Sequence, residues 1–160
     1  MPAHPSAGNH DNTLANALMY YYGSQNKPFV YRCINRLDRD TTGLTIVAKH
    51  ALAGGILGNA VAKRAIHRTY YAVCSGCTPA CMRISAPIAR KDASPIERCV
   101  DFKRGETAVT EFMRIKYNPD NNLSLVKLRL LTGRTHQIPV HMKYIGVPLI
   151  GDYLYTPDYT

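Results

Sequence analysis

The chain has 160 residues, 46% of them apolar, and its 20 Lys and Arg side chains outnumber 11 Asp and Glu side chains, giving a formal net charge of +9. A chain of this length can bury a sizeable core, so we expect one domain over residues 1–160. No stretch approaches the ~18 consecutive apolar residues of a membrane span, and residues 1–5 lack the basic and apolar regions of a secretion signal. We therefore expect a cytoplasmic protein without a membrane partner.

The first predicted element is a helix that follows a lead-in rich in Pro, His and Gly. Asp11 or Asn12 can cap this helix, apolar side chains recur at helical spacing up to Tyr21, and Gly23 ends it. Residues 20–22 are three consecutive tyrosines, which could stack on nucleic-acid bases. Aromatic side chains at helical spacing are more often part of a core, and we expect that role here.

Two strands and a second helix follow. Residues 29–31 and 44–49 have the apolar character of strands, and residues 34–44 include a polar loop with a high density of charge. Residues 51–62 show a helical pattern, despite three glycines that cost up to ~1 kcal/mol each. The cations of residues 63–68 suit a helix C-terminus, and the net charge leads us to expect that they also bind a polyanion.

The second half of the chain is predicted to form mainly strands. Apolar patterns predict strands at residues 69–75, 82–84, 108–117 and 123–130, with prolines between them. A last helix carries Val140, Met142, Tyr144 and Ile145. These elements predict an α+β fold, a mixed and mainly antiparallel sheet flanked by helices.

Five cysteines raise the possibility of a metal site. Cys74, Cys77 and Cys81 include a C-x2-C spacing that zinc ligands often show. A second pair of ligands is hard to find, and Cys74 lies within a predicted strand. We therefore expect free, reduced thiols and no metal.

The loop after residue 34 places Asp38 between Arg36 and Arg39. Cations within ~4–6 Å would keep this carboxylate ionised at neutral pH, and an ionised carboxylate can act as a nucleophile or general base. The other interpretation is structural, with Asp38 and Asp40 capping a turn. The loop by itself leaves both open.

Three segments with characteristic polar residues carry a further signal when they are taken together. The loop reads Asn35-Arg36-Leu37-Asp38 and ends in Thr-Thr-Gly, residues 131–138 read Leu-Thr-Gly-Arg-Thr-His-Gln-Ile, and residues 68–76 read Arg-Thr-Tyr-Tyr-Ala-Val-Cys-Ser-Gly. These segments resemble the RluA-type pseudouridine synthases. That family has His/Asn-Arg-Leu-Asp, Gly-Arg-Thr-His-Gln-Ile-Arg-Val-His and a Lys-x-Tyr-x-Ala-x-Val-x-Gly strand.

The resemblance implies an isomerase that breaks the bond from ribose to N1 of uracil, turns the base and joins it again through C5, without a cofactor. It implies catalytic roles for Asp38, the essential carboxylate, and Tyr70, which would stack on the uracil. RNA-binding roles fall to five further residues: Arg36, Arg39, Arg134, His136 and Gln137. Among these, Arg36 would fill the gap left by the flipped-out base. The implied partner is structured RNA, ribosomal or transfer, and we expect a monomer.

The chain departs from the family pattern at Pro139, where the family has an arginine that pairs with the catalytic aspartate. If Thr135 or His136 caps the helix, Pro139 lies in the first turn, where most of the usual ~3 kcal/mol penalty is avoided. An impaired pseudo-enzyme that still binds RNA is therefore an alternative. A hydrolase that uses Asp38 with His136 or His141 is another, disfavoured because neither a nucleophile elbow nor an HExxH pattern is present.

The two ends of the chain also differ from the family pattern. The family's Asn-Lys-Pro motif and the strand before it do not appear in this sequence, and neither do the last strands that close the floor of the pocket. We therefore expect a catalytic domain that lacks family strands at both ends.

Overall fold

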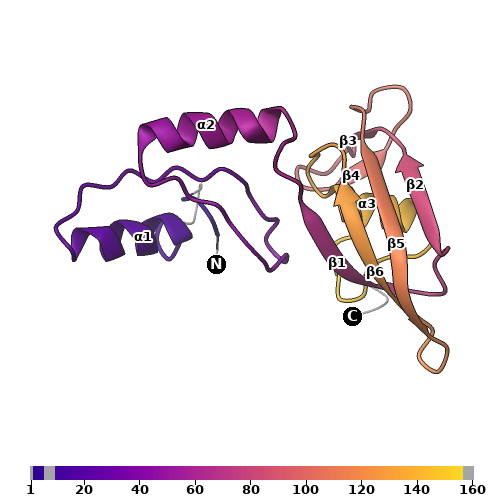
Figure 1. The fold of residues 1–160 in the computed structure, drawn as a ribbon. Coiled ribbons are helices and arrows are strands. Elements are labelled where there is room, and N and C mark those ends of the chain that lie inside the picture. The colour runs from indigo at the N-terminus through magenta and orange to yellow at the C-terminus, as the bar shows by residue number, and fades with distance from the viewer. Residues whose placement is uncertain (1, 6–9, 157–160) are drawn as a thin grey trace. The chain divides into compact units, whose positions relative to one another are not determined.

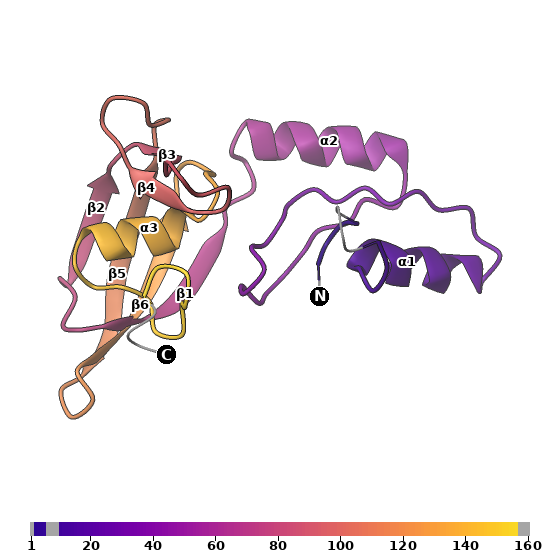
Figure 2. The same ribbon diagram turned by 180° about the vertical axis from the view of Figure 1, so that it is seen from behind.

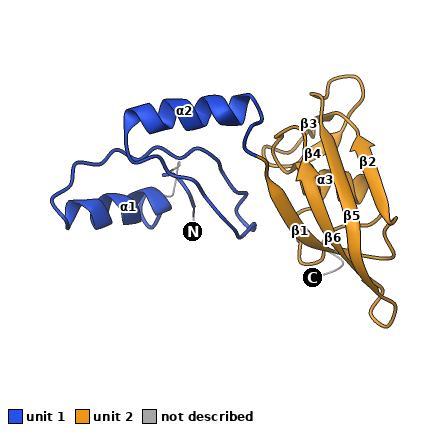
Figure 3. Ribbon diagram, in the orientation of Figure 1, with its two compact units in different colours: residues 1–66 blue, residues 67–160 orange. Residues whose placement is uncertain are grey.

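The computed structural model describes residues 2–5 and 10–156 (Figure 1). The chain forms two compact units, Met1–Ile66 and His67–Thr160, which Figure 3 shows in different colours. The single domain expected over residues 1–160 stays a prediction. In the described part of the chain, every helix is too short or too polar to cross a membrane.

The first unit begins with α1, Leu14–Gly23, whose N-cap is Thr13. The predicted cap at Asp11 or Asn12 is wrong, because the left-handed backbone of Asn12 (φ 59°) turns the chain just before the cap. The Thr13 hydroxyl accepts from the Asn16 N–H at 3.3 Å, and the Asn16 side chain accepts from the Thr13 N–H at 3.2 Å. This reciprocal capping box satisfies two backbone donors that the helix itself leaves unpaired.

The tyrosines of α1 do not form a core within this unit. Tyr20 is 80% exposed and Tyr21 is 55% exposed, so the core prediction is wrong for both. The Tyr22 ring stacks on Phe29, with ring centroids 4.2 Å apart and planes 16° apart. Of the three tyrosines, Tyr22 is therefore the one that packs against the segment after the helix.

The second helix of this unit, α2, spans Ala51–Ala62 as predicted. Its cap is His50, whose Nδ1 accepts from the Ala53 N–H at 3.2 Å. The two predicted strands before it are wrong, because residues 29–31 and 44–49 form no regular strand. The isolated bridge in this part of the described chain joins Val47 to Cys33, which lies outside both predicted ranges. Strands need a ladder of partners, and this unit supplies them over too few residues.

The second unit contains a four-stranded antiparallel sheet in the order β1-β6-β5-β2. Its strands are β1 Thr69–Ser75, β2 Cys81–Ser85, β5 Val109–Asn118 and β6 Leu123–Leu130, each close to its predicted range. A separate hairpin pairs β3 Ile88–Arg90 with β4 Arg98–Val100. With α3 Gln137–Tyr144 against the sheet, this arrangement confirms the α+β class.

The core of this unit lies between α3 and one face of the sheet, as Figures 1 and 2 show from opposite sides. Alternate residues of the strands meet the helix there: Cys74, Ile84, Phe112, Val126 and Leu128 pack with Met142 and Val147. The opposite face carries exposed side chains such as Tyr71, Met113 and Leu125. This one-sided burial is what alternation along antiparallel strands produces.

The ends of α3 are well defined. His136 is the N-cap, so Pro139 is the third residue of the helix, where the predicted tolerance of proline holds. At the other end Gly146 has φ +79°. The Gly146 N–H donates to Lys143 O and the Val147 N–H donates to Met142 O, each at 3.0 Å. This Schellman ending requires the left-handed conformation that glycine adopts at little cost.

Candidate functional site

The Asp38 loop belongs to the first unit. The side chain of Asn35, at the start of the loop, connects it to the end of the loop. The Asn35 amide donates to Leu44 O at 3.1 Å, and its carbonyl accepts from the Ile46 N–H at 2.8 Å. Inside the loop, the Thr41 N–H donates to Asp38 O at 3.0 Å and closes a turn. The loop is therefore braced, and it presents Asp38 in an exposed position.

The sequence suggested that Arg36 and Arg39 would both lie close to Asp38, and the structure arranges these charges differently. Arg39 pairs with Asp40, with its Nε and Nη2 at 3.2 Å from the carboxylate. Within the described residues of the first unit, Asp38 forms no ion pair, and Arg36 is exposed. The carboxylate of Asp38 is thus left available to a ligand, while Asp40 takes the neighbouring cation.

Tyr70 lies on β1 of the second unit, opposite Leu128 of β6. Its ring is half-buried and packs against the main core, on the same face of the sheet as α3. The next residue, Tyr71, points to the other face and is 64% exposed. Of these two neighbouring tyrosines, Tyr70 is therefore the one that combines a supported ring with partial access from outside.

Gln137 organises the segment that precedes α3. It is 2% exposed, and its Oε1 accepts from the Thr132 hydroxyl at 2.8 Å and from the Arg134 N–H at 3.0 Å. Its Nε2 donates to Val109 O at 3.0 Å and to the Thr110 hydroxyl at 2.9 Å. Every polar atom of this amide is satisfied inside the protein, which fixes the loop to β5.

His141 lies one turn further along α3 and is fully buried. Its Nε2 is 2.8 Å from Ala86 O and its Nδ1 is 2.9 Å from the Thr110 hydroxyl. Burial lowers the pKa of this imidazole below its ordinary value. Because both ring nitrogens are bonded inside the core, His141 cannot serve the hydrolase that was the second alternative.

Arg134 and His136 each have a partner in the second unit. The Arg134 guanidinium pairs with Glu106 and donates from Nε to Thr107 O at 3.0 Å. The Nδ1 of His136 lies 2.7 Å from the Tyr155 hydroxyl. That hydroxyl also accepts from the Arg98 N–H at 2.9 Å. The motif segment is therefore connected to the β3–β4 hairpin through one phenol.

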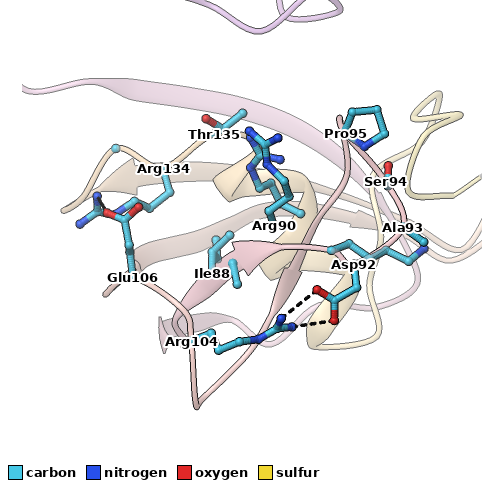
Figure 4. A pocket seen from close by; sticks show the side chains of 14 residues that line it. Ile88, Arg90, Asp92, Ala93, Ser94, Pro95, Arg104, Glu106, Arg134 and Thr135 are labelled. Atoms are coloured by element: carbon cyan, nitrogen blue, oxygen red, sulfur yellow. Dashed lines mark hydrogen bonds and ion pairs between the residues drawn. The ribbon is translucent and has the colours of Figure 1, made fainter.

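A cavity of about 780 Å³ opens between this segment and the hairpin (Figure 4). One wall is formed by residues 133–135, and the other by residues 88–95 with Arg98, Arg104 and Glu106. The sequence did not predict this cavity, because its two walls are distant in the chain. The signal that could have indicated it is the gathering of cations at residues 90, 91, 98, 103 and 104.

The predicted site residues fall into two groups. The structure brings Tyr70, Arg134, His136 and Gln137 into the second unit, and it places Arg36, Asp38 and Arg39 in the first. Among the described residues, no three His, Cys, Asp or Glu side chains gather closely enough to hold a metal ion. All five cysteines are free thiols, of which Cys74 is buried.

Residues 1–144 match the sequence family described as RNA pseudouridylate synthase. The chain is 42% identical over 153 residues to an uncharacterized RNA pseudouridine synthase of Bacillus subtilis, YhcT, covering 95% of this chain and 50% of that protein. It is also 42% identical over 152 residues to the ribosomal large subunit pseudouridine synthase D of Haemophilus ducreyi, covering 95% of this chain and 46% of that one. The chain spans about half the length of these curated relatives.

A solved structure agrees with the sequence comparisons. Human RNA Pseudouridylate Synthase Domain Containing 1 superimposes with a TM-score of 0.77 at 27% identity, covering 89% of this chain and 60% of that chain. The similarity therefore extends to the fold as well as to the sequence.

Proposed function

Because this chain belongs to the family of RNA pseudouridylate synthases, we propose that it isomerises specific uridines in structured RNA to pseudouridine, with Asp38 as the catalytic carboxylate. The observation that carries the proposal is the braced loop, in which Asn35 holds both ends and Asp38 is exposed without an ion pair among the described residues of its unit. A relative named for the ribosomal large subunit favours ribosomal over transfer RNA as the substrate. The monomeric state and the cytoplasmic location stay predictions, and we propose no cofactor.

The proposed roles follow from what each side chain can do. Asp38 acts on the ribose or the uracil ring as a nucleophile or general base. Tyr70 supplies a supported aromatic face against which uracil can stack. Arg36, which is exposed, can place its planar guanidinium in the gap left when the nucleotide is flipped out.

The remaining predicted residues divide by burial. Arg39 and Arg134 carry positive charge beside the two motif loops and are proposed to contact RNA phosphates. His136 is half-buried, with one ring nitrogen at Tyr155, which leaves Nε2 for the RNA. Gln137 is buried with its amide satisfied, so we propose that it positions the loop instead of touching RNA.

The test is a tritium-release assay on RNA transcribed with uridine labelled at C5, because the new bond at C5 displaces that hydrogen. We expect release with the unmodified protein and none with Asp38→Asn, while RNA affinity changes little. Asp40→Asn is the matched control, since it removes the same charge two residues away and should retain measurable turnover. Full turnover in Asp38→Asn would remove this residue from its catalytic role.

Pro139 favours a second candidate, an RNA-binding protein of the same fold with impaired catalysis. The structure puts Pro139 in the first turn of α3, so the fold accommodates it without an arginine. Tight RNA binding with no tritium release by the unmodified chain would identify this second candidate. Release at a steady rate would exclude it.

A further inference from the structure

The β3–β4 hairpin places two arginines directly opposite each other, Arg90 on β3 and Arg98 on β4. Like charges at facing positions of neighbouring strands destabilise the pair unless something lies between them. Among the described residues, the Arg98 guanidinium donates only to the carbonyls of Ile96, at 3.2 Å, and Glu97, at 3.1 Å. Among the described residues, the Arg90 side chain has no hydrogen-bond or ion-pair partner. Both guanidinium groups therefore keep donors for a ligand.

The carboxylates near this pair are already engaged. Asp92 receives two bonds from Arg104, at 2.8 and 3.0 Å, which Figure 4 marks with dashed lines. Glu97 pairs with Lys91 at 2.7 Å. These cations hold the pKa of Asp92 and of Glu97 below the usual range, so both carboxylates are ionised and matched to other partners.

The Glu106 carboxylate is engaged in the same way, since it pairs with Arg134. The cavity is lined by five cations, Arg90, Lys91, Arg98, Arg104 and Arg134, against two carboxylates, Asp92 and Glu106. The positive excess is concentrated at Arg90 and Arg98, the two cations that face each other without a carboxylate. An anion placed between them would relieve that repulsion.

The hairpin holds these side chains in a fixed frame. The Arg98 N–H donates to the buried Tyr155 hydroxyl at 2.9 Å, and the Lys91 N–H donates to Glu97 O at 3.1 Å. Ile88 anchors the base of β3 in a small buried cluster with Val140 and Tyr155. A ligand at this hairpin therefore meets a frame that needs little ordering on binding.

We propose that Arg90 and Arg98 form a binding site for one phosphodiester group of the substrate RNA. The geometry suits it, because guanidinium groups recognise phosphate oxygens with paired, charge-assisted hydrogen bonds. The inference rests on the proposed function, since the same cavity is walled by Arg134 and Thr135 of residues 131–138, the second motif of the family resemblance. A volume of about 780 Å³ also suits a nucleotide better than an isolated ion.

The first test measures RNA affinity and its salt dependence, with Asp38→Asn present in every protein so that turnover does not interfere. The hairpin variant is Arg90→Gln with Arg98→Gln. Its matched control is Lys116→Gln with Lys127→Gln, which removes the same charge from exposed positions of β5 and β6. We expect the hairpin variant to bind about tenfold more weakly or worse at about 0.1 M salt, with the slope of log K against log salt flattened by roughly 0.7 to 0.9.

The second test separates RNA from free phosphate. Inorganic phosphate is added at constant ionic strength while the backbone amide signals of residues 88–100 are followed by NMR. Shifts in the unmodified hairpin that disappear in the double variant support the anion site. The variant Arg90→Lys with Arg98→Lys keeps the charge and loses the paired geometry, so its RNA affinity should recover only in part. This variant also shows whether misfolding of the glutamine variant explains the loss of affinity.

The outcomes are distinct. Equal losses of RNA affinity in the hairpin and control variants would overturn the site. Phosphate-induced shifts without any change in RNA affinity would assign the site to a free anion and overturn the RNA proposal. Failure of the proposed function looks different, because it appears as missing tritium release by the unmodified protein on an RNA that it binds.

Discussion

The Nδ1 of His141 lies 2.9 Å from the hydroxyl of Thr110, and this contact fixes the orientation of a whole buried network. Ala86 O can only accept, so Nε2 of His141 carries the proton and Nδ1 accepts from Thr110. The Thr110 oxygen in turn accepts from Gln137. The helix that follows the second motif is thereby tied to β5 by bonds that allow one protonation state only.

We predict that stability falls as the solution is acidified through the range near pH 6. Burial lowers the folded-state pKa of His141 below its ordinary 6.5. The unfolded chain then binds more protons between those two values, so the free energy of unfolding decreases as pH falls below about 6.5, by at most about 1.4 kcal/mol per pH unit. Above about pH 6.5 the contribution is fully present.

Urea titrations at about pH 7.5, 6.5 and 5.5 measure this dependence. His141→Gln should flatten the curve in that range, and His10→Gln, at an exposed position before α1, is the control variant. An identical pH dependence in His141→Gln would show that another group titrates.

We predict that Gln137→Ala lowers the free energy of unfolding by about 2–4 kcal/mol, because it leaves the Thr132 hydroxyl and the Arg134 N–H without their acceptor. The measurement is chemical denaturation followed by circular dichroism. Gln25→Ala, in an exposed loop, is the control and should change stability by less than about 0.5 kcal/mol. A small effect at Gln137 would mean that water replaces the amide.

We predict that Pro139→Arg raises turnover at least tenfold, equivalent to about 1.4 kcal/mol of transition-state stabilisation. An arginine in the first turn of α3 would restore the partner that the family pattern gives to the catalytic aspartate. The assay is tritium release by two proteins with matched circular dichroism spectra. In the structure Arg134 pairs with Glu106. Equal turnover would show that the pairing role is filled elsewhere or not required.

We predict that the five thiols differ strongly in reactivity. Cys74 is fully buried, and burial raises its pKa to about 12, so the reactive thiolate is scarce at neutral pH. Cys77 and Cys81 are exposed. Brief treatment with iodoacetamide followed by peptide mass spectrometry should find Cys77 and Cys81 modified and Cys74 intact. Denaturant should expose Cys74, and modification of it under native conditions would contradict its placement in the core.

Most regular elements of the second unit could be predicted from the sequence, because each has a long pattern and a stable partner. β6 alternates buried and exposed residues over Leu123–Leu130, and α3 places Val140 and Met142 in the core. The expectation failed where a partner was missing. Residues 29–31 and 44–49 are apolar enough for strands, but a strand exists only where a neighbour supplies its hydrogen bonds.

The candidate site was predictable as motifs but not as geometry. The order of residues does not show that the Asn35 side chain bonds to the far end of the Asp38 loop, or that Arg39 pairs with Asp40. The β3–β4 hairpin was also missed, because strands of three residues carry too few side chains to show a period. Its facing arginines become visible only when the register is known.

The hydroxyl of Tyr155 touches both the Arg98 N–H and the His136 ring, so one phenol spans the gap between the hairpin and the second motif. Burial raises its pKa to about 12, and the group therefore stays protonated throughout the physiological range. The hairpin and the second motif are consequently joined by a side chain that does not itself line the cavity. A nucleotide bound in this cavity would therefore lie between segments that one neutral phenol connects.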